Sequence, residues 1–318
     1  MMPRYLHDHP SFIDLLNIVA EEKGVEPGLV EKDYWIMHVL YGLKEQGFEF
    51  ELKGGTSLSK GYQIIERFSE DIDIHMKPPA GFEINENPKN CNPRNVESRK
   101  RYYDWLASHI RIDGIVSVER DTLFDETECY RSGGIRLHYD ARTNSIDGVK
   151  EGVLLEAGFD ITSPNSPILI SSWAIEKALS QQVMIIDNRA KEILCYHPGF
   201  TLVEKLQTIA TKYRHEIVEG GTAKVNFMRQ YYDVYCLLSN ETVLAFIGSE
   251  PYNEHKRSRF PEADLDIPVS QNEAFLLTSE EQRAVFKARY HATAALYYNG
   301  QPPFNDLLER IREHIHLL

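Results

Sequence analysis

Hydrophobic and polar positions change their spacing several times along the chain, and each change predicts an element. Residues 12–24 (FIDLLNIVAEEKG) and 27–47 (PGLVEKDYWIMHVLYGLKEQG) have apolar residues at helical spacing and end in glycine, so two helices are predicted. Residues 48–55 (FEFELKGG) alternate apolar and polar positions, which is typical of a strand. Helical spacing returns at residues 57–68, and residues 71–76 (DIDIHM) alternate again. The predicted order is strand, glycine turn, helix, strand.

The next stretch continues as a mixture of loop, helix and strand. Residues 78–95 are rich in proline, asparagine and glycine and predict a loop, which a helix over residues 96–110 follows. Residues 133–141 (GGIRLHYDA) and 152–161 (GVLLEAGFDI) are strand-like and are expected to be neighbours in the same sheet. From about residue 167 the pattern becomes mainly helical. We therefore predict an α/β half at 1–165 and a mainly helical C-terminal half at 166–318.

The helical half is built from several amphipathic stretches. Leu202, Leu206 and Ile209 define one apolar face. A polar segment, 248–271, separates the stretches into two groups. The predicted helices begin near Ser171 and cover residues 201–217, 223–240, 279–300 and 305–315.

Composition fits a folded globular protein, with 318 residues, 42% hydrophobic and 26% charged. No window reaches the roughly 18 uninterrupted apolar residues of a membrane helix, and the N-terminus lacks the basic leader and apolar run of a secretory signal. The four cysteines, Cys91, Cys129, Cys195 and Cys236, are scattered without a CxxC spacing. We therefore expect unpaired thiols and a reducing, cytoplasmic location.

The formal net charge of −13 argues against a protein that grips nucleic acid with its whole surface. Local basic runs at 97–101 and 255–260 offer concentrated positive charge, although a solvated run is the simpler interpretation of each. Charge therefore neither supports nor excludes a nucleic-acid partner.

Two aspartates in the second predicted strand provide the first candidate chemistry. Residues two apart on a strand point to the same side, so Asp71 and Asp73 share a face while Ile72 and Ile74 occupy the other. Neighbouring carboxylates repel each other, and a divalent cation between them removes that cost. Oxygen ligands that leave positions open to water and phosphate suit Mg²⁺. By itself, such a pair is more often a solvated strand face.

The turn before the aspartates adds a phosphate-binding element. Gly54 and Gly55 allow the backbone to approach a ligand closely. Thr56 and Ser57 begin the next predicted helix, where free N–H groups attract phosphate. The stretch lacks the GxxxxGK[ST] pattern of a P-loop. The order of glycine turn, helix and aspartate strand is more specific than either part alone.

The combined stretch resembles a known family. Gly55-Thr56-Ser57, with thirteen residues before Asp71-Ile72-Asp73, resembles the signature of the DNA polymerase beta-like nucleotidyltransferase superfamily. The text LKGGTSLSKGYQIIERFSEDIDI is similar to abortive-infection toxin nucleotidyltransferases of the AbiEii/AbiGii type. Further stretches similar to that family are VEKDYW at 30–35, TLVEKLQTIATKYR at 201–214 and MRQYYDVYCLL at 228–238.

The resemblance implies roles for individual residues. Lys205 would neutralise a bound triphosphate and Asp233 would orient that lysine, although Asp233 also lies four residues after Arg229 and suits a simple helix pair. Lys53 and Lys60 flank the glycine turn, and either has the length to reach phosphate. Together, the residues and the resemblance predict nucleotide binding by Gly54, Gly55, Thr56, Ser57, Lys60 and Lys205, and catalytic roles for Asp71, Asp73, Lys205 and Asp233.

A third metal carboxylate is harder to assign. Glu156 lies among apolar residues at a strand position, where an unused charge would be costly. Asp140 and Asp160 end strand-like runs and compete for the role. We favour Asp71, Asp73 and Glu156 as metal ligands. Residues 32–35 of the second helix are interpreted mainly as packing, and the histidines of the HDH stretch at 7–9 are set aside as lying near a terminus.

Taken with the resemblance, these patterns imply a nucleotidyltransferase α/β core with flanking helices and an active site in a cleft closed by the helical half. The implied cofactor is Mg²⁺, or Mn²⁺, and the substrate is ATP, GTP or CTP. The implied reaction transfers a nucleotide to a tRNA 3′ end, as the toxin of a type IV toxin–antitoxin and phage-defence system with a separately encoded antitoxin. The alternatives are transfer to a protein hydroxyl or small molecule, phosphotransfer, and a non-catalytic nucleotide-binding protein.

Overall fold

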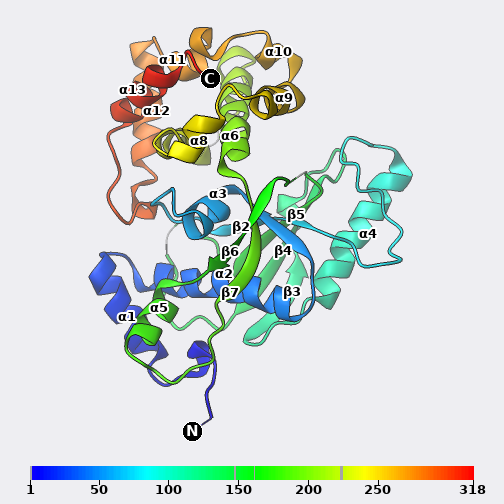
Figure 1. Cartoon of the computed structure of the whole chain (residues 1–318), viewed down its shortest axis with the longest axis vertical. Coiled ribbons are helices and arrows are strands. Elements are labelled where there is room, and N and C mark those ends of the chain that lie inside the picture. The colour runs from blue at the N-terminus through cyan, green and yellow to red at the C-terminus, as the bar shows by residue number, and fades with distance from the viewer. Residues whose placement is uncertain (1, 147, 161, 223–224) are drawn as a thin grey trace. The chain divides into compact units, whose positions relative to one another are not determined.

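The computed structural model describes residues 2–146, 148–160, 162–222 and 225–318. The chain divides into two compact units (Figure 1). The first contains residues 1–62 and 69–196, and the second contains residues 63–68 and 197–318. Within the described residues, no helix has both the length and the apolar character needed to cross a membrane.

A mixed seven-stranded sheet forms the centre of the first unit, in the order β3-β4-β5-β2-β1-β7-β6. The β1–β7 and β2–β5 pairs are parallel, and the remaining neighbours are antiparallel. This mixed sheet with helices confirms the predicted α/β class. The strands are β1 (Phe50–Lys53), β2 (Asp71–Met76), β3 (Ile115–Arg120), β4 (Ser132–Tyr139), β5 (Val153–Gly158), β6 (Asn165–Ile170) and β7 (Ala190–Tyr196).

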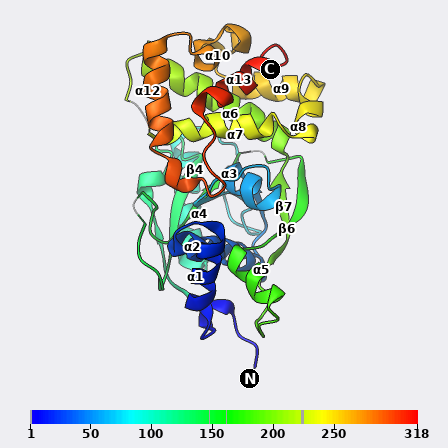
Figure 2. The same ribbon diagram turned by 90° about the vertical axis from the view of Figure 1, so that its left-hand side faces the viewer.

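Helices of the first unit pack on this sheet and on one another. The α1, α2 and α5 helices are in mutual contact (Figure 2), and α4 packs on β3 and β4. Pro27 is the first residue of α2, a position where proline is favoured. Gly24 ends α1 in the left-handed conformation, which glycine adopts without strain. The bounds are α1 (Phe12–Lys23), α2 (Pro27–Glu45), α3 (Gly54–Thr56), α4 (Pro93–His109) and α5 (Trp173–Ser180), with 3₁₀ turns at Leu6–Asp8 and Thr122–Phe124.

The helix predicted over residues 57–68 is wrong beyond Gly61. The chain forms α3 and then a π-helical turn, Ser57–Gly61, after which residues 63–68 are not helical. Gln63 adopts a positive φ of 54°, which interrupts the helical path. Ile65 and Phe68 are buried nevertheless, so their apolar spacing reflects packing in the second unit and not a helix face.

Three strands, β3, β6 and β7, were absent from the sequence-based prediction. The β3 and β6 strands lie at the two edges of the sheet, and β6 contains Pro167, a residue tolerated mainly in edge strands. Most positions of β3 and β6 are exposed or half-buried, so neither strand has a regularly buried face that its sequence could reveal. Since β6 and β7 complete the sheet, the first unit extends to Tyr196, past the expected division near residue 165.

Helices make up most of the second unit. The α6 helix packs on α7, α8 and α9, and Leu202, Leu206 and Ile209 are fully buried, which confirms the predicted apolar face. The expected polar segment at 248–271 is largely helical. The predicted helix at 223–240 includes residues 223–224, which lie outside the described residues. The helices are α6 (Pro198–Tyr213), α7 (Arg229–Leu237), α8 (Glu241–Phe246), α9 (Glu250–Arg259), α10 (Glu262–Leu265), α11 (Glu273–Leu276), α12 (Glu280–His291) and α13 (Phe304–His314), with shorter turns at Arg214–Val218, Val225–Met228, Val269–Gln271 and Ala294–Leu296.

A short excursion of the chain, residues 63–68, belongs to this helical unit. The Phe68 N–H donates to the Leu296 carbonyl at 2.7 Å, and the Tyr232 hydroxyl accepts the Glu66 N–H at 3.1 Å. Arg67 also forms an isolated antiparallel bridge with Tyr297. The segment between the glycine turn and the aspartate strand is therefore anchored in the second unit.

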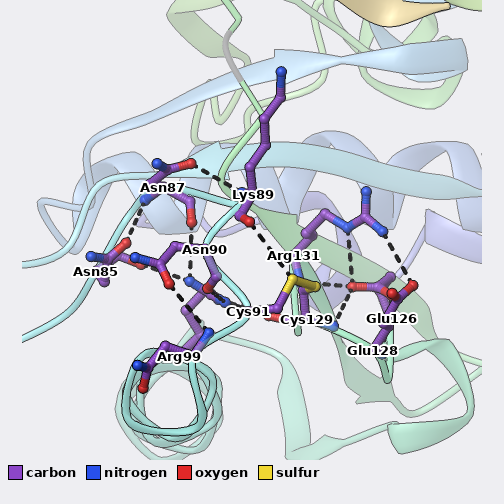
Figure 3. Close-up of a disulfide and its surroundings, with 11 residues drawn as sticks. Asn85, Asn87, Lys89, Asn90, Cys91, Arg99, Glu126, Glu128, Cys129 and Arg131 are labelled. Carbon is purple, nitrogen blue, oxygen red and sulfur yellow. Dashed lines mark hydrogen bonds and ion pairs between the residues drawn. A yellow bond between two sulfur atoms is a disulfide. The ribbon is translucent and has the colours of Figure 1, made fainter. Parts of the chain in front are cut away.

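A disulfide between Cys91 and Cys129 corrects the expectation of four unpaired thiols (Figure 3). The two residues are 38 positions apart, with Cα atoms 4.8 Å from each other. Arg99 of α4 is completely buried beside them, and its guanidinium donates to the Cys129 carbonyl and to carbonyls of Asn85, Asn87 and Asn90. This anchoring brings the two loops together, which the cysteine spacing could not reveal. Cys195 and Cys236 are free.

Candidate active site

Carboxylates of β2 and β5 gather on one face of the sheet. Ile72 is fully buried, whereas Asp71 and Asp73 on either side of it are only partly buried. β5 runs parallel to β2, with Asp73 aligned to Glu156. Aligned residues on neighbouring strands are about 4.8 Å apart and share a face. The structure thus brings together the three residues predicted to bind metal.

The protein environment makes ionisation of Glu156 unfavourable. Burial, together with the negative charges of Asp73 and Asp71, raises the pKa of Glu156 to about 8. Lys150 and Lys53 oppose this shift without cancelling it. The carboxylate cluster therefore lacks enough positive charge to stabilise all three ionised groups.

The two alternative third carboxylates have other surroundings. The Asp140 side chain is 72% exposed, and its carboxylate lies 3.5 Å from Arg142. Asp160 forms an ion pair of 2.6 Å with Lys53. Only Glu156 of the three is aligned with Asp73 across the β2–β5 ladder. This register favours Glu156 as the third carboxylate.

The glycine turn lies directly against the aspartates. Gly54 has a φ of +71°, and a Cβ at this position would collide with the Asp73 carboxylate. The buried Thr56 hydroxyl donates to the Asp71 carbonyl. The Ser57 hydroxyl is buried and has no hydrogen-bond partner among the described residues. The turn is thus held beside β2 and keeps one polar atom available for a ligand.

Lys60 is engaged elsewhere in the first unit. Its ammonium lies 2.5 Å from the Asp33 carboxylate and donates to the Ser171 carbonyl at 2.9 Å. The Lys60 side chain is only 9% exposed. These contacts describe a buried anchor between the turn and α2, so they offer no support for the predicted phosphate contact.

Lys150 is a member of this site that the sequence did not identify. Its ammonium lies 2.8 Å from Asp71 Oδ2. The residue belongs to the connection between β4 and β5, where a lysine carries no recognisable motif. Only the fold brings it to the carboxylates, so no sequence signal was available to find it.

The charged residues at the start of α2 are anchors as well as packing groups. Glu31, Lys32 and Asp33 are each at most 3% exposed. Glu31 accepts hydrogen bonds from the N–H groups of Arg142 and Thr143, and Asp33 accepts the Trp173 N–H. Interpreting this stretch mainly as packing missed that its charges hold the β4–β5 connection and the start of α5.

The second unit contains a separate ion cluster. Asp233 on α7 is fully buried and receives two hydrogen bonds from the Arg67 guanidinium, at 2.6 and 2.7 Å. The Lys205 ammonium of α6 lies 2.9 Å from the same carboxylate. The structure therefore joins the predicted pair, Lys205 and Asp233, and adds Arg67, whose segment had been interpreted as an ordinary helix.

Asp233 is a permanently charged partner in this cluster. Burial alone would raise its pKa, but Arg67 and Lys205 outweigh burial and lower the pKa of Asp233 to about 2. Both carboxylate oxygens are used by these cations. This geometry suits a residue that orients Lys205, as the resemblance implied, and does not suit a general base.

The described residues contain one group of three candidate ligands within 4.8 Å of one another, formed by His7, Asp8 and Asp113. His7 belongs to a buried hydrogen-bond chain in which Nδ1 lies 2.7 Å from the Tyr34 hydroxyl. Nε2 lies 3.4 Å from Asp113 and 3.7 Å from Asp8. The chain continues through Asn188 and His38 to the Asp113 carbonyl. His38 Nε2 donates to that carbonyl, and His38 Nδ1 accepts from the Asn188 amide. The same amide donates to the Tyr34 hydroxyl, whose own proton is then donated to His7 Nδ1. The neutral His7 ring therefore carries its proton on Nε2, facing Asp113. The group is therefore explained as a structural anchor of the N-terminal segment.

Comparison with known proteins identifies the family of the chain. The chain belongs to the family described as nucleotidyl transferase AbiEii toxin, type IV toxin–antitoxin system, whose profile matches residues 38–310. This range includes the glycine turn, the three carboxylates and the Lys205–Asp233 pair. No curated protein matches the sequence.

Two solved structures are similar to the chain at low identity. One is an antigenic nucleotidyltransferase-like protein from Paracoccidioides brasiliensis, with 10% identity, coverage of 74% of this chain and 96% of that chain, and a TM-score of 0.34. The other is terminal uridylyl transferase 4 from Trypanosoma brucei with bound dUTP, with 12% identity, coverage of 94% and 97%, and a TM-score of 0.30.

Proposed function

We propose that this protein transfers a nucleoside monophosphate from a nucleoside triphosphate to the 3′ end of a tRNA. The carboxylates of Asp71, Asp73 and Glu156 would hold Mg²⁺, or Mn²⁺ in its place. The family supports nucleotidyl transfer by a toxin. The observation that carries the proposal is the set of three carboxylates beside a glycine turn, all within one unit of the fold.

The residues of the first unit fit a metal-bound nucleotide. Asp71 Oδ1 and Ser57 Oγ are buried without a hydrogen-bond partner among the described residues. A buried polar atom without a partner is costly, so such atoms are good candidates for ligand contacts. Divalent cations would also offset the burial and the carboxylate repulsion that together raise the pKa of Glu156. Hard oxygen donors are the ligands that Mg²⁺ prefers.

The proposed reaction is a phosphoryl substitution. The acceptor hydroxyl gives its proton to water and its oxygen forms a bond to the α-phosphorus. The bond from that phosphorus to the bridging oxygen of the β-phosphate breaks, and pyrophosphate leaves. When bound, the metal ions supply charge neutralisation and lower the pKa of the attacking hydroxyl. The N–H groups of residues 54–56 would bind phosphate oxygens, whereas the Ser57 N–H already donates to the Gly54 carbonyl. Gly54 permits this close approach because it has no side chain to displace Asp73.

The cluster of the second unit supplies an oriented cation in this proposal. Lys205 is partly exposed, whereas its partner Asp233 is fully buried. The Arg67 guanidinium donates two hydrogen bonds to the same Asp233 carboxylate. Lys205 would neutralise phosphate charge during transfer, with Asp233 and Arg67 restricting its side chain to one geometry.

The biological setting follows from the family. A type IV toxin family implies a separately encoded antitoxin, and a tRNA acceptor would allow transfer to arrest translation in phage defence. A protein or small-molecule acceptor is the second candidate, because the net charge of −13 does not favour a polyanionic substrate. The two differ in where the transferred label would be found.

The test is incubation of the purified protein with Mg²⁺, total tRNA and each α-³²P nucleotide in turn. We expect label in tRNA with the wild-type chain and none with Asp71→Asn or Asp73→Asn. Asp140→Asn is a matched control, since Asp140 is an exposed aspartate of the same unit and pairs with Arg142. It should label tRNA at the wild-type rate.

Other outcomes identify the alternatives. Label in protein or in a small molecule would replace the tRNA acceptor while retaining nucleotidyl transfer. Transfer from γ-³²P nucleotide instead of α-³²P nucleotide would identify phosphotransfer. Nucleotide binding without any transfer, in every acceptor mixture, would leave a non-catalytic nucleotide-binding protein.

A further inference from the structure

One lysine beside the carboxylates has the position of a counter-ion. The Lys150 ammonium lies 2.8 Å from Asp71 Oδ2, whereas Asp71 Oδ1 is buried without a hydrogen-bond partner among the described residues. Another lysine of this region, Lys32, pairs with Glu70, which lies outside the carboxylate cluster. Lys150 therefore neutralises a carboxylate that is proposed to bind metal.

Two buried charges fix the main chain of Lys150. Its N–H donates to Glu70 Oε2 at 3.0 Å, and its carbonyl accepts a hydrogen bond from the Lys32 ammonium. Lys32 and Glu70 are 2% and 4% exposed and lie 3.7 Å apart. The Lys150 side chain, by contrast, is 25% exposed. A rearrangement of this residue would therefore involve its side chain and leave its main chain in place.

The charge of Lys150 acts on the carboxylate cluster as a whole. Besides its contact with Asp71, it opposes the rise in the pKa of Glu156 that burial and the neighbouring aspartates cause. The ammonium also lies 4.4 Å from the centre of the Phe124 ring, and the face of an aromatic ring attracts a cation. These contacts stabilise the ammonium beside Asp71, so another cation that binds there has to overcome them.

A divalent cation and the Lys150 ammonium compete for the same carboxylate. Both are attracted by its negative charge, and like charges a few ångströms apart repel each other in a partly buried site. Mg²⁺ bound by Asp71 would therefore weaken the contact between Asp71 and Lys150. Lys150 also lines a cavity of about 250 Å³, together with Glu151 and Ser145, two exposed residues whose side chains carry oxygen acceptors. This cavity gives the displaced ammonium a polar space to enter.

We infer that Lys150 is the internal counter-ion of the metal site: its ammonium holds Asp71 in the metal-free chain, and a divalent cation must displace it to bind. The inference rests on the proposed function, because it takes Asp71 as a metal ligand. Lys150 therefore stabilises the chain before metal binds and lowers the affinity of the site for metal.

The test compares metal binding with and without this ammonium. Purified wild type and Lys150→Met are titrated with Mn²⁺ in the absence of nucleotide, and free Mn²⁺ is measured by electron paramagnetic resonance. Binding that is abolished when Asp73→Asn is introduced into each chain belongs to the carboxylate site. Lys150→Met should bind Mn²⁺ there about tenfold more tightly than wild type, because a repelling charge is removed. Lys150→Arg keeps a positive charge and should bind Mn²⁺ as weakly as wild type.

Thermal melting provides a second readout. In EDTA, Lys150→Met should melt about 2 °C or more below wild type, because the carboxylates lose their counter-ion. With saturating Mn²⁺ this deficit should disappear, because the metal then supplies the positive charge. Lys77→Met is the matched control, since the Lys77 side chain is 50% exposed and its ammonium lies 3.4 Å from Glu49. It should behave like wild type in both conditions.

The outcomes separate this inference from the proposed reaction. Equal Mn²⁺ binding by wild type and Lys150→Met would overturn the counter-ion role, even in a chain that transfers nucleotide. Weaker binding would overturn it as well, because Lys150 would then orient Asp71 for the metal. A melting deficit that persists in saturating Mn²⁺ would make Lys150 a structural residue only.

Two further outcomes concern the reaction itself. Tighter Mn²⁺ binding by Lys150→Met in a chain that transfers no nucleotide would support the inference while the proposed reaction fails. Absence of Mn²⁺ binding in both chains would overturn the inference together with the proposed metal site.

Discussion

The two charged clusters of this molecule are built on opposite principles. In the first unit, three carboxylates share one sheet face, and burial with mutual repulsion raises the pKa of Glu156 to about 8. In the second unit, Arg67 and Lys205 surround the single carboxylate of Asp233 and lower its pKa to about 2. One cluster has too little positive charge, and the other has a full set of partners.

This difference separates binding from positioning. Repelling carboxylates and an oxygen without a hydrogen bond destabilise the ligand-free chain. A bound cation stabilises these groups and so offsets that cost in folding free energy. A closed ion cluster gains little from a new ligand and instead restricts the geometry of its members. This contrast is the reason for proposing metal and nucleotide binding at the first cluster and the positioning of Lys205 at the second.

The largest expected effect tests the binding cluster through activity. Asp73→Asn keeps the shape of the side chain but removes a proposed metal ligand, and we expect nucleotide transfer to fall about a thousandfold or more, a loss typical of removing a key electrostatic group. Because Asp73 repels Glu156, the metal-free variant should be as stable as wild type or more stable. Transfer of α-³²P label and urea unfolding without Mg²⁺ measure the two quantities. A large loss of stability in the variant would contradict the contrast between the clusters.

The next effect tests the positioning cluster through stability. Asp233→Asn leaves Arg67 and Lys205 without a counter-charge in a buried site, which typically costs about 3–5 kcal/mol of folding free energy. Urea unfolding should show this loss at neutral pH. The exposed Asp266→Asn on the same unit provides the control and should unfold like wild type. If Asp233→Asn is equally stable, the cluster is not the closed ion network that its distances indicate.

A smaller effect is expected at Arg67, where charge is kept and geometry is lost. Arg67→Lys retains the positive charge but cannot make both hydrogen bonds to Asp233, so we expect a cost of about 1–3 kcal/mol. If Arg67 positions Lys205 through Asp233, the kcat for transfer should also fall, with little change in the KM for nucleotide. Arg257→Lys on an exposed surface of α9 controls for the exchange itself. A change in KM alone would argue against a positioning role.

The sequence predicted most of the binding cluster because its residues are local. Asp71 and Asp73 share a face through strand periodicity, and the glycine turn is only a few residues away, so the period and the turn chemistry were sufficient. Predicting Glu156 as a ligand required the assumption that its strand lies in the same sheet as Asp73. The β2–β5 register places Glu156 beside Asp73.

The residues that escaped prediction depend on contacts distant in sequence. Arg67 lies in apolar spacing that imitates a helix, yet its segment pairs with residues near Tyr297 in the second unit. Lys150 reaches Asp71 from a connection without regular structure, and Cys91 reaches Cys129 across an entire helix. No local sequence pattern predicts these contacts. They form because buried groups such as Arg99 and Glu70 bind the main chain of loops whose own sequences do not determine a conformation.

The smallest expected effect is a pH dependence of stability that only the binding cluster should show. The folded chain holds the pKa of Glu156 at about 8, above its usual value of 4.5, so the folded state binds a proton that the unfolded state releases between these values. Stability from this group is therefore fully present below about pH 4.5 and is lost as the pH rises to about 8. Urea unfolding of metal-free protein at intervals across this range should show Glu156→Gln with a shallower decline than wild type, while Glu83→Gln, at an exposed position, follows wild type. The pKa of Asp233 is lowered to about 2, so this carboxylate stays ionised across the same range and adds no pH dependence there. An equal decline in wild type and Glu156→Gln would show that the folded chain does not raise the pKa of Glu156. The contrast between an open and a closed charge cluster would then lose its electrostatic basis.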